Sequence, residues 1–284
     1  MATENVKISQ AVEGALEQIK ENAPEEFSKL NADPKLKDAI TEAARAAAAE
    51  ELQLADEFAS KPGQDIRERL SRHLPEDRIK LIEEALSIPT FRMEITKRSD
   101  GKYWVQLTRK GEDFLPGREL ATVADIEWSS ILQEASIVVE AVLLVMHAVG
   151  ISLTVSKRTM EKTVEDTANA IKRSPKLQTA IAEFIASWKA AGGNAVAKAK
   201  AVFNLIKDAY EAKILWTIIK SLCKEMKWYD WLETVAKVVA MIIAALATEG
   251  AALIARIALI ILDAVDFARK IANLEQLEGI KQTL

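Results

Sequence analysis

The sequence predicts a mainly α-helical protein, a multi-helix bundle with one small β-hairpin inserted into it. Glycine (10) and proline (7) are scarce among the 284 residues, and the dominant alanine, leucine, lysine and glutamate favour helix over sheet. Alternation of apolar and polar residues with period two, which is typical of a strand, is confined to residues 90–110. We therefore expect an acidic amphipathic helical region at 1–89, a β-hairpin and linker at 90–117, and a helical bundle with an apolar C-terminal helix pair at 118–284.

The first region is acidic, with 12 Lys/Arg against 19 Asp/Glu over residues 1–89, a balance of −7. Asp33 and Pro34 mark the start of a long helix, because aspartate caps a helix N-terminus and proline fits its first turn. This helix should extend to about Ser60. It is rich in alanine and offers little apolar area, so it either packs closely against a neighbour or stands partly free. Two shorter helices are expected at 65–73 and 76–86.

The second region reads as a hairpin that turns at Ser99-Asp100-Gly101, since Asp-Gly between alternating segments is a strong hairpin signal. A lone hairpin is marginally stable, so it must lie on the helices or gain strands from a partner chain. Gly111–Arg118 is the expected linker. We interpret the outward face as a solvated edge protected by cations, with contact to an anionic surface as the alternative. These outward residues are Arg92, Lys97, Arg98, Lys102, Arg109 and Lys110.

The third region opens with a long helix, Glu119–Val149, whose second half is almost wholly apolar. Its polar residues Gln133, Glu140 and His147 are seven apart, so they share one thin stripe on a mostly buried helix. His147 with Glu140 is a candidate pH sensor, because an imidazole that gains a proton below about pH 6.5 would loosen an apolar bundle. An interior histidine that simply packs is the commoner arrangement.

The chain is organised around two apolar helical segments, Val238–Thr248 and Ala251–Leu262, which meet at Glu249-Gly250. A helix that is apolar nearly all round lies either at the centre of a bundle or in lipid. Beyond the break, ionisable residues recur every seven positions and predict one thin polar stripe. They are Glu249, Arg256, Asp263 and Lys270.

The motifs of common enzymes are missing from the sequence, including the phosphate-binding and dinucleotide-binding glycine patterns, the His-Glu-x-x-His zinc motif and the nucleophile elbow. His73 and His147 are the two histidines, and each has leucine where a di-metal carboxylate bundle needs glutamate. Cys223 is the single cysteine and is interpreted as a packing residue. We expect no catalysis, no cofactor and no metal site.

The net charge of −4 and the pI near 5.5 argue against a nucleic-acid partner. The N-terminus lacks the basic and apolar segments of a secretory signal, and no run of 18 residues is free of charge. We therefore expect cytoplasmic synthesis as a soluble protein. Later release and association with a membrane stay compatible with this expectation.

Our main functional hypothesis is a membrane-active protein of the α-helical pore-forming, toxin-like kind. Its soluble form would bury an apolar helical hairpin at 228–270, in which each arm has about 20 residues and spans roughly 30 Å, the thickness of a bilayer's hydrocarbon. In pattern only, this hairpin is similar to the buried hydrophobic hairpin of bacteriocin-type helical toxins, which fold in soluble form and unpack on a membrane. That similarity assigns no residue a role.

The expected partner is a lipid membrane, on which the chain would form a homo-oligomer. Glu249-Gly250 would be the tip of the hairpin, and the aromatic residues ahead of it would form an interfacial collar. A charged side chain near the bilayer centre costs about 2.5–3.5 kcal/mol, so the charges would have to line a pore or pair between subunits. The residues expected to act at the membrane are Trp228, Tyr229, Trp231, Glu249, Gly250, Arg256 and Asp263.

Two alternatives use the same helices. In a non-enzymatic soluble interaction or scaffold protein, the apolar pair would be the core of a large bundle, with the aromatic residues covering its end. In a carrier, an apolar ligand would lie between the helices at 130–149 and 235–267. Leakage of vesicles distinguishes the first hypothesis from both alternatives, and a co-purifying lipid or pigment would identify a carrier.

Overall fold

The computed structural model describes residues 2–61, 63–83, 91–109, 112–151, 153, 155–261 and 265–283. These residues form thirteen helices and a small three-stranded antiparallel sheet, which confirms the mainly α fold expected from the sequence. The helices are α1 (Ala2–Asn22), α2 (Pro24–Ala32), α3 (Pro34–Ala59), α4 (Ile66–Ser71), α5 (Glu76–Glu83), α6 (Val123–Ala148), α7 (Lys157–Arg173), α8 (Pro175–Ala191), α9 (Ala195–Glu211), α10 (Ile214–Leu222), α11 (Trp228–Leu246), α12 (Ala251–Ile261) and α13 (Val265–Lys281).

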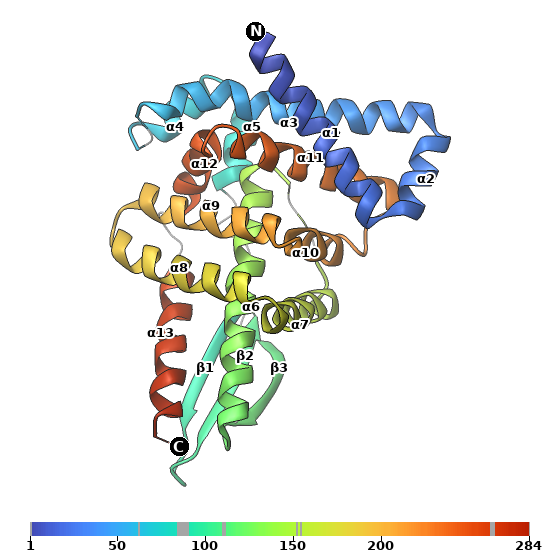
Figure 1. Cartoon of the computed structure of the whole chain (residues 1–284). Coiled ribbons are helices and arrows are strands. Elements are labelled where there is room, and N and C mark those ends of the chain that lie inside the picture. Colours follow the sequence, from blue (N-terminus) through green and yellow to red (C-terminus); the bar gives the residue numbers. More distant parts are fainter. Residues whose placement is uncertain are drawn as a thin grey trace.

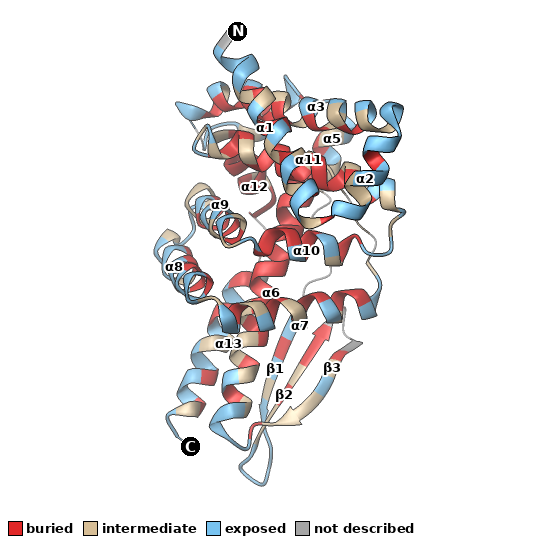
Figure 2. Cartoon of the chain, turned by 45° about the vertical axis from the view of Figure 1, so that its right-hand side comes forward, coloured by how far each residue is buried: buried red, intermediate tan, exposed pale blue. Residues whose placement is uncertain are grey.

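Helix α6 is the axis of the molecule (Figure 1). The helices α1 to α5 lie at one end of it together with α11 and α12, helices α7 to α10 surround its middle, and the sheet lies beside α13 at the other end. Every residue from Ala135 to Val149 is buried, so α6 is covered on all sides along its second half (Figure 2). This burial explains why polar residues on that half are confined to one stripe.

Local capping signals set the start of α3 as the sequence predicts, whereas α6, expected from Glu119, begins at Val123 behind a Thr122 capping box. The Asp33 side chain accepts a hydrogen bond from Leu36 N at 3.1 Å ahead of α3, and Ser174 accepts one from Leu177 N at 3.2 Å ahead of α8. Both caps precede a proline in the first helical turn. Ser156 caps α7, and its side chain accepts a hydrogen bond from Thr159 N.

The sheet has the order β1-β2-β3, with strands β1 (Phe91–Lys97), β2 (Tyr103–Arg109) and β3 (Glu112–Glu119). The expected hairpin is present: Met93 pairs with Leu107 and Ile95 with Val105. The linker expected at Gly111–Arg118 is wrong over its described part, because these residues form β3 and pair with β2. Pro116 is tolerated there because β3 is an edge strand.

The sheet is stabilised on its apolar face and along its β1 edge. Met93, Val105 and Leu107 are buried, and helix α13 covers the β1 edge, where Asn273 Nδ2 donates to the Met93 carbonyl at 2.7 Å. The hairpin therefore gains its third strand from its own chain and packs on its own helices. Either feature supplies the support that an isolated hairpin lacks.

The acidic N-terminal region packs directly on the apolar C-terminal pair. Helices α1 and α3 both contact α11, and α3 also contacts α12. Ala44 and Ala48 are fully buried, so the alanine-rich α3 packs closely against its neighbours rather than standing free. A Cβ built on Gly14 of α1 would lie only 2.8 Å from the Ile243 side chain of α11, which shows how closely the two helices approach.

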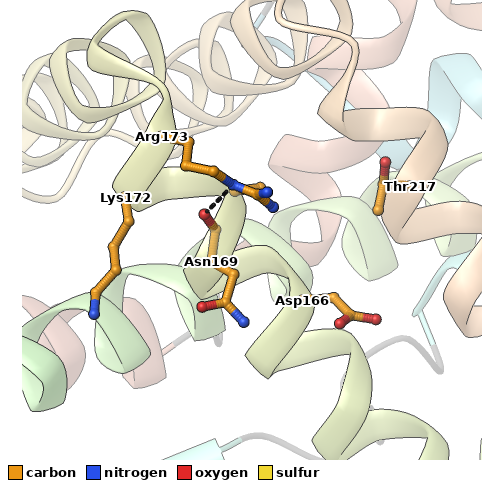
Figure 3. Close-up of a pocket in the computed structure, with 6 residues that line it drawn as sticks. Asp166, Asn169, Lys172, Arg173 and Thr217 are labelled. Carbon is orange, nitrogen blue, oxygen red and sulfur yellow. Dashed lines mark hydrogen bonds between the residues drawn. The ribbon is translucent and has the colours of Figure 1, made fainter.

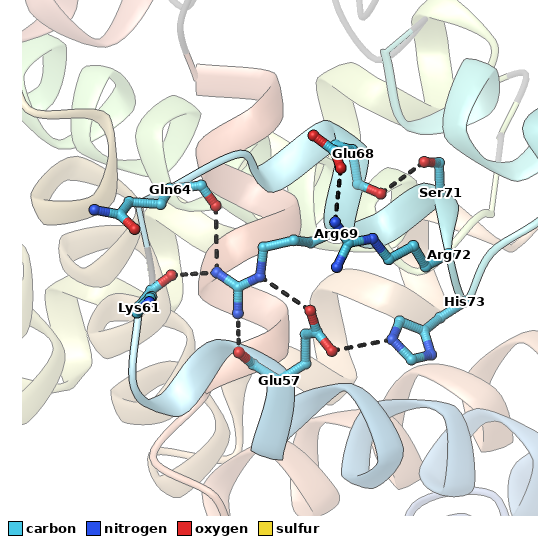
Figure 4. Close-up of polar contacts among 8 residues, drawn as sticks. All are labelled: Glu57, Lys61, Gln64, Glu68, Arg69, Ser71, Arg72 and His73. Atoms are coloured by element: carbon cyan, nitrogen blue, oxygen red, sulfur yellow. Dashed lines mark hydrogen bonds and ion pairs between the residues drawn. The ribbon is translucent and has the colours of Figure 1, made fainter.

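One arginine fixes the chain that follows α3 (Figure 4). Arg69 of α4 pairs with the Glu57 carboxylate at 3.0 Å and donates to the main-chain carbonyls of Glu57, Lys61 and Gln64. His73 Nε2 lies 3.2 Å from the other Glu57 oxygen. Hydrogen bonds from Arg69 and His73 lower the pKa of Glu57. The bonds hold α4 against the C-terminal end of α3, and α4 in turn contacts α12.

Candidate functional site

The candidate site is the apolar helix pair α11 and α12 with the ionisable residues buried against it. Nearly all of the side chains of α12, including Arg256, are buried, as is most of α11. The chain between the helices turns at Glu249 and Gly250, both with positive φ (53° and 74°). Gly250 N donates to the Ala245 carbonyl at 2.7 Å and closes the end of α11.

The two helices do not form the antiparallel hairpin that the sequence suggests. The axis of α12 is turned by 112° from that of α11, so α12 crosses the bundle toward α9 and α6 instead of running back along α11. Gly250 explains part of this path, because a Cβ at this position would lie 2.7 Å from the Phe203 ring of α9. Only glycine lets the two segments approach so closely.

We expect Gly250→Ala to lower the free energy of unfolding by on the order of 3 kcal/mol, from the clash with Phe203 and the cost of positive φ. Urea denaturation followed by circular dichroism measures this change. Gly279→Ala is the matched control, because a Cβ at Gly279 in α13 meets nothing within 4 Å. The control should be stabilised by about 0.5–1 kcal/mol. Equal effects of the two substitutions would contradict the packing argument.

The aromatic residues at the start of α11 divide between core and surface. Trp231 is buried and stacks edge-to-face on Trp216 at 6.1 Å between ring centroids. Trp228 and Tyr229 lie nearer to solvent, and Lys227 Nζ lies 5.7 Å from the Tyr229 ring. The arrangement places polar tips at the surface and one indole inside, which suits the end of a bundle as well as a membrane interface.

Arg256 of α12 is fully buried and is held by carboxylates from α3. Its Nη2 lies 3.1 Å from Glu50 Oε1 and 3.7 Å from Glu51 Oε2. Arg78 of α5 shares the Glu50 oxygen at 3.3 Å, and Leu253 N donates to Glu51 Oε1 at 2.9 Å. We call Glu50, Glu51, Arg78 and Arg256 the α3–α12 ion network. It joins the three helices α3, α5 and α12.

Glu51 was not anticipated from the sequence. Ala44, Ala48 and Ala55 recur at helical spacing on the buried face of α3, and Glu51 falls on the same face. That spacing was the available signal for a buried carboxylate. Burial raises the pKa of Glu51 to about 7 against the opposing attraction of Arg256. Because the folded-state pKa is the higher one, Glu51 favours the folded state at acidic pH and loses this contribution as the pH rises toward 7.

A second buried ion pair joins the stripes of two different helices. Lys270 of α13 and Glu140 of α6 are both buried, and Lys270 Nζ lies 3.2 Å from Glu140 Oε1. Gln133 Nε2 also donates to the Lys270 carbonyl at 3.3 Å. The sequence placed Glu140 and Lys270 on separate polar stripes, and the fold brings these stripes together.

The stripe expected at Glu249, Arg256, Asp263 and Lys270 is therefore not one face. Glu249 is exposed at the break, Arg256 faces α3, and Lys270 belongs to the separate helix α13. Asp263 lies outside the described residues. Because Arg256 contacts α3 and Lys270 contacts α6, the spacing of seven does not place these two residues on a common face.

His147 and Glu140 do not act on each other as a pair. Glu140 is engaged with Lys270, while His147 Nδ1 lies 3.0 Å from the Leu143 carbonyl one turn before it. Burial lowers the pKa of His147 and so favours the neutral form of its ring in the folded protein. The contribution of His147 to stability is lost as the pH falls below the unfolded value of 6.5. Acid loosening through His147 stays a prediction, and it is opposed by Glu51.

Within the described residues, no three His, Cys, Asp or Glu side chains lie close enough together to hold a metal ion. Cys223 is buried, and burial raises the pKa of its thiol to about 12. This environment suits a packing residue and disfavours the reactive thiolate.

Known proteins offer no assignment for this chain. No family matches its sequence, and neither curated proteins nor solved structures show a significant similarity. Among the described helices, α6 alone is long and apolar enough to cross a membrane, and 89% of its most apolar segment is buried. The bent pair of α11 and α12 is long and apolar enough when the two helices are counted as one span. The buried core helix of a soluble protein can have the same length and apolar composition.

Proposed function

We propose that the protein is membrane-active, and that the described fold keeps apolar helices buried until they are released onto a lipid surface. One observation carries the proposal: bilayer-length apolar segments, α6 and the α11–α12 pair, occur together in one chain and are sheltered by amphipathic helices. Helices α1 and α3 form the cover over α11. In the proposed function, this cover moves away and the exposed helices associate with lipid as a homo-oligomer.

The buried ion pairs set the energetic condition for such a release. Moving α12 away from α3 separates Arg256 from Glu51, and moving α13 away from α6 separates Lys270 from Glu140. A charge near a bilayer centre costs about 2.5–3.5 kcal/mol, so the released charges must line a polar lumen or pair between subunits. The Arg256–Glu51 pair therefore holds α3 of the cover on α12 in water, and the Lys270–Glu140 pair holds α13 on α6.

Leakage of dye from lipid vesicles across a pH series tests the proposal. A reversible disulfide provides the matched control: Gly14→Cys with Ile243→Cys, in a Cys223→Ala background, would join α1 to α11 at a point where the two helices lie close together. We expect leakage by the reduced protein and little or none by the oxidised one. Absence of leakage at micromolar protein from every vesicle composition, or equal leakage in both redox states, would contradict release of α11.

A soluble scaffold is the second candidate, and the ion networks favour it. Two buried ion pairs stabilise one particular packing of α3, α6, α12 and α13, and such groups can specify a unique arrangement. A scaffold would leave vesicles intact and would co-purify with a stoichiometric protein partner. The carrier hypothesis places its ligand between α6 and the α11–α12 pair, whereas the two cavities described here lie under the sheet and beside α7.

A further inference from the structure

A polar pocket of about 550 Å³ lies between α7 and α10, away from the apolar helix pair (Figure 3). Helix α7 supplies most of its wall, and α10 supplies Thr217 opposite. The lining residues are Asp166, Asn169, Ala170, Lys172, Arg173 and Thr217. Most of these side chains are exposed, so a solute can reach them without any movement of the fold.

The walls of this pocket are held at a fixed distance. Thr163 Oγ1 of α7 donates to Ser221 Oγ of α10 at 2.7 Å. Ser156 and Thr159 both donate to the Glu225 carboxylate just beyond α10, and these hydrogen bonds lower the pKa of Glu225. The pocket is thus formed before any ligand arrives, which reduces the entropy cost of binding.

Charges of opposite sign occupy the two ends of the pocket. Arg173 Nε donates to the Asn169 carbonyl at 3.1 Å, which orients the guanidinium toward Thr217. Asp166 lies seven residues earlier, or about 10 Å along the helix axis. Lys172 extends away from the Arg173 guanidinium (Figure 3), and its Nζ lies 4.2 Å from the Trp128 ring centroid. The pocket therefore presents one guanidinium at one end and one carboxylate at the other.

We propose that this pocket binds a small zwitterion of the phosphorylethanolamine class, either as a free solute or as a lipid headgroup. The Arg173 guanidinium matches a phosphate ester through paired N–H donors, and Asp166 receives the ammonium group. The Asn169 amide and the Thr217 hydroxyl supply further hydrogen bonds between the two ends. Donors from three side chains, Arg173, Asn169 and Thr217, suit the several acceptor oxygens of a phosphate better than the two of a carboxylate. The site requires no membrane insertion and so stands apart from the proposed function.

Titration of free O-phosphorylethanolamine into the wild-type chain, followed by shifts of the Asn169 and Ala170 amide signals in NMR spectra, tests the site. Arg173→Gln should weaken binding by about tenfold or more, for this probe and for inorganic phosphate alike. Asp166→Asn should weaken binding of phosphorylethanolamine and leave that of inorganic phosphate equal or stronger, because a repelling carboxylate is removed. Arg158→Gln, an exposed charge removal on the same helix, should leave both affinities unchanged.

Vesicles distinguish the two sources of the ligand. Flotation with phosphatidylethanolamine vesicles, lost in Arg173→Gln, would identify the headgroup, while binding of the free probe alone would identify a soluble solute. Either result supports the site, whether or not vesicles leak. The proposal is overturned if neither probe shifts the amide signals at millimolar concentration, or if Arg173→Gln and Asp166→Asn bind phosphorylethanolamine as the wild type does. Circular dichroism of each variant verifies that it is folded.

Discussion

Replacing Arg256 by methionine is expected to lower the free energy of unfolding by about 3–5 kcal/mol at pH 8.5. Methionine places an apolar side chain of similar length in the core, but the fully buried Glu51 carboxylate then lacks the Arg256 charge. Glu50 loses less, because it is partly exposed and retains Arg78. Urea denaturation followed by circular dichroism gives the unfolding free energy directly.

The pH dependence identifies the cause of this loss. The pKa of Glu51 is about 7 in the folded protein and 4.5 in the reference state, so its contribution is complete below 4.5 and declines by about 3 kcal/mol as the pH passes 7. Without Arg256 the folded-state pKa rises further, and the decline continues to higher pH. The deficit of Arg256→Met relative to wild type should therefore be smaller at pH 5.5, where Glu51 is protonated in both proteins.

The double substitution Arg256→Met with Glu51→Met is the matched control. Removing both charges leaves no buried ion, and the stability should return close to that of the wild type or exceed it. A deficit of equal size at pH 5.5 and 8.5, or one that persists in the double variant, would show that packing around Arg256 rather than the Glu51 charge causes the loss.

Replacing Lys270 by methionine is expected to have an effect of similar size, about 3–5 kcal/mol, because Glu140 would remain buried on α6 without its cation. The contact of Gln133 with the Lys270 main chain is retained in this variant, so the change reports on the ion pair. Thermal or urea unfolding measures it, and Lys270→Met with Glu140→Met should recover most of the loss.

Helix α13 also offers a surface control. Lys281 pairs with Glu127 of α6 at 2.9 Å, and both side chains are substantially exposed. Lys281→Met removes the same charge from the same helix, and solvent screening makes its effect on stability much smaller. A Lys281→Met variant as unstable as Lys270→Met would contradict the view that burial determines the cost.

The elements themselves were largely predictable. Asp33-Pro34 begins a helix where the sequence places it, and Asp100-Gly101 turns the hairpin. These signals act over three or four residues, so the sequence contains all of the interacting groups. Strand β3 was missed because Pro116-Gly117 is a turn signal by local rules. Pairing with β2 overrides it at an edge, and Gly117 leaves room for the Trp104 indole.

The candidate site was predictable in part. Arg256 and Glu140 stood out as ionisable groups in apolar helices, and both are buried. Their partners were not predictable from spacing, since Leu253 and Glu51, which hydrogen bond beside Arg256, are 202 residues apart. The 112° turn between α11 and α12 could not be predicted from the sequence either. Gly250 signals that the helix ends there, whereas the direction of the next helix depends on the fit against Phe203.

The sequence by itself determined that this protein is helical, that α6, α11 and α12 must be kept from water, and that each of them carries few polar groups. Those properties follow from composition and from the periodicity of single helices. The tertiary structure alone decided that α3 supplies the carboxylates for Arg256 and that α13 supplies the cation for Glu140. Buried charges require opposite charges at contact distance, and only the packing of helices far apart in the chain determines which charges meet.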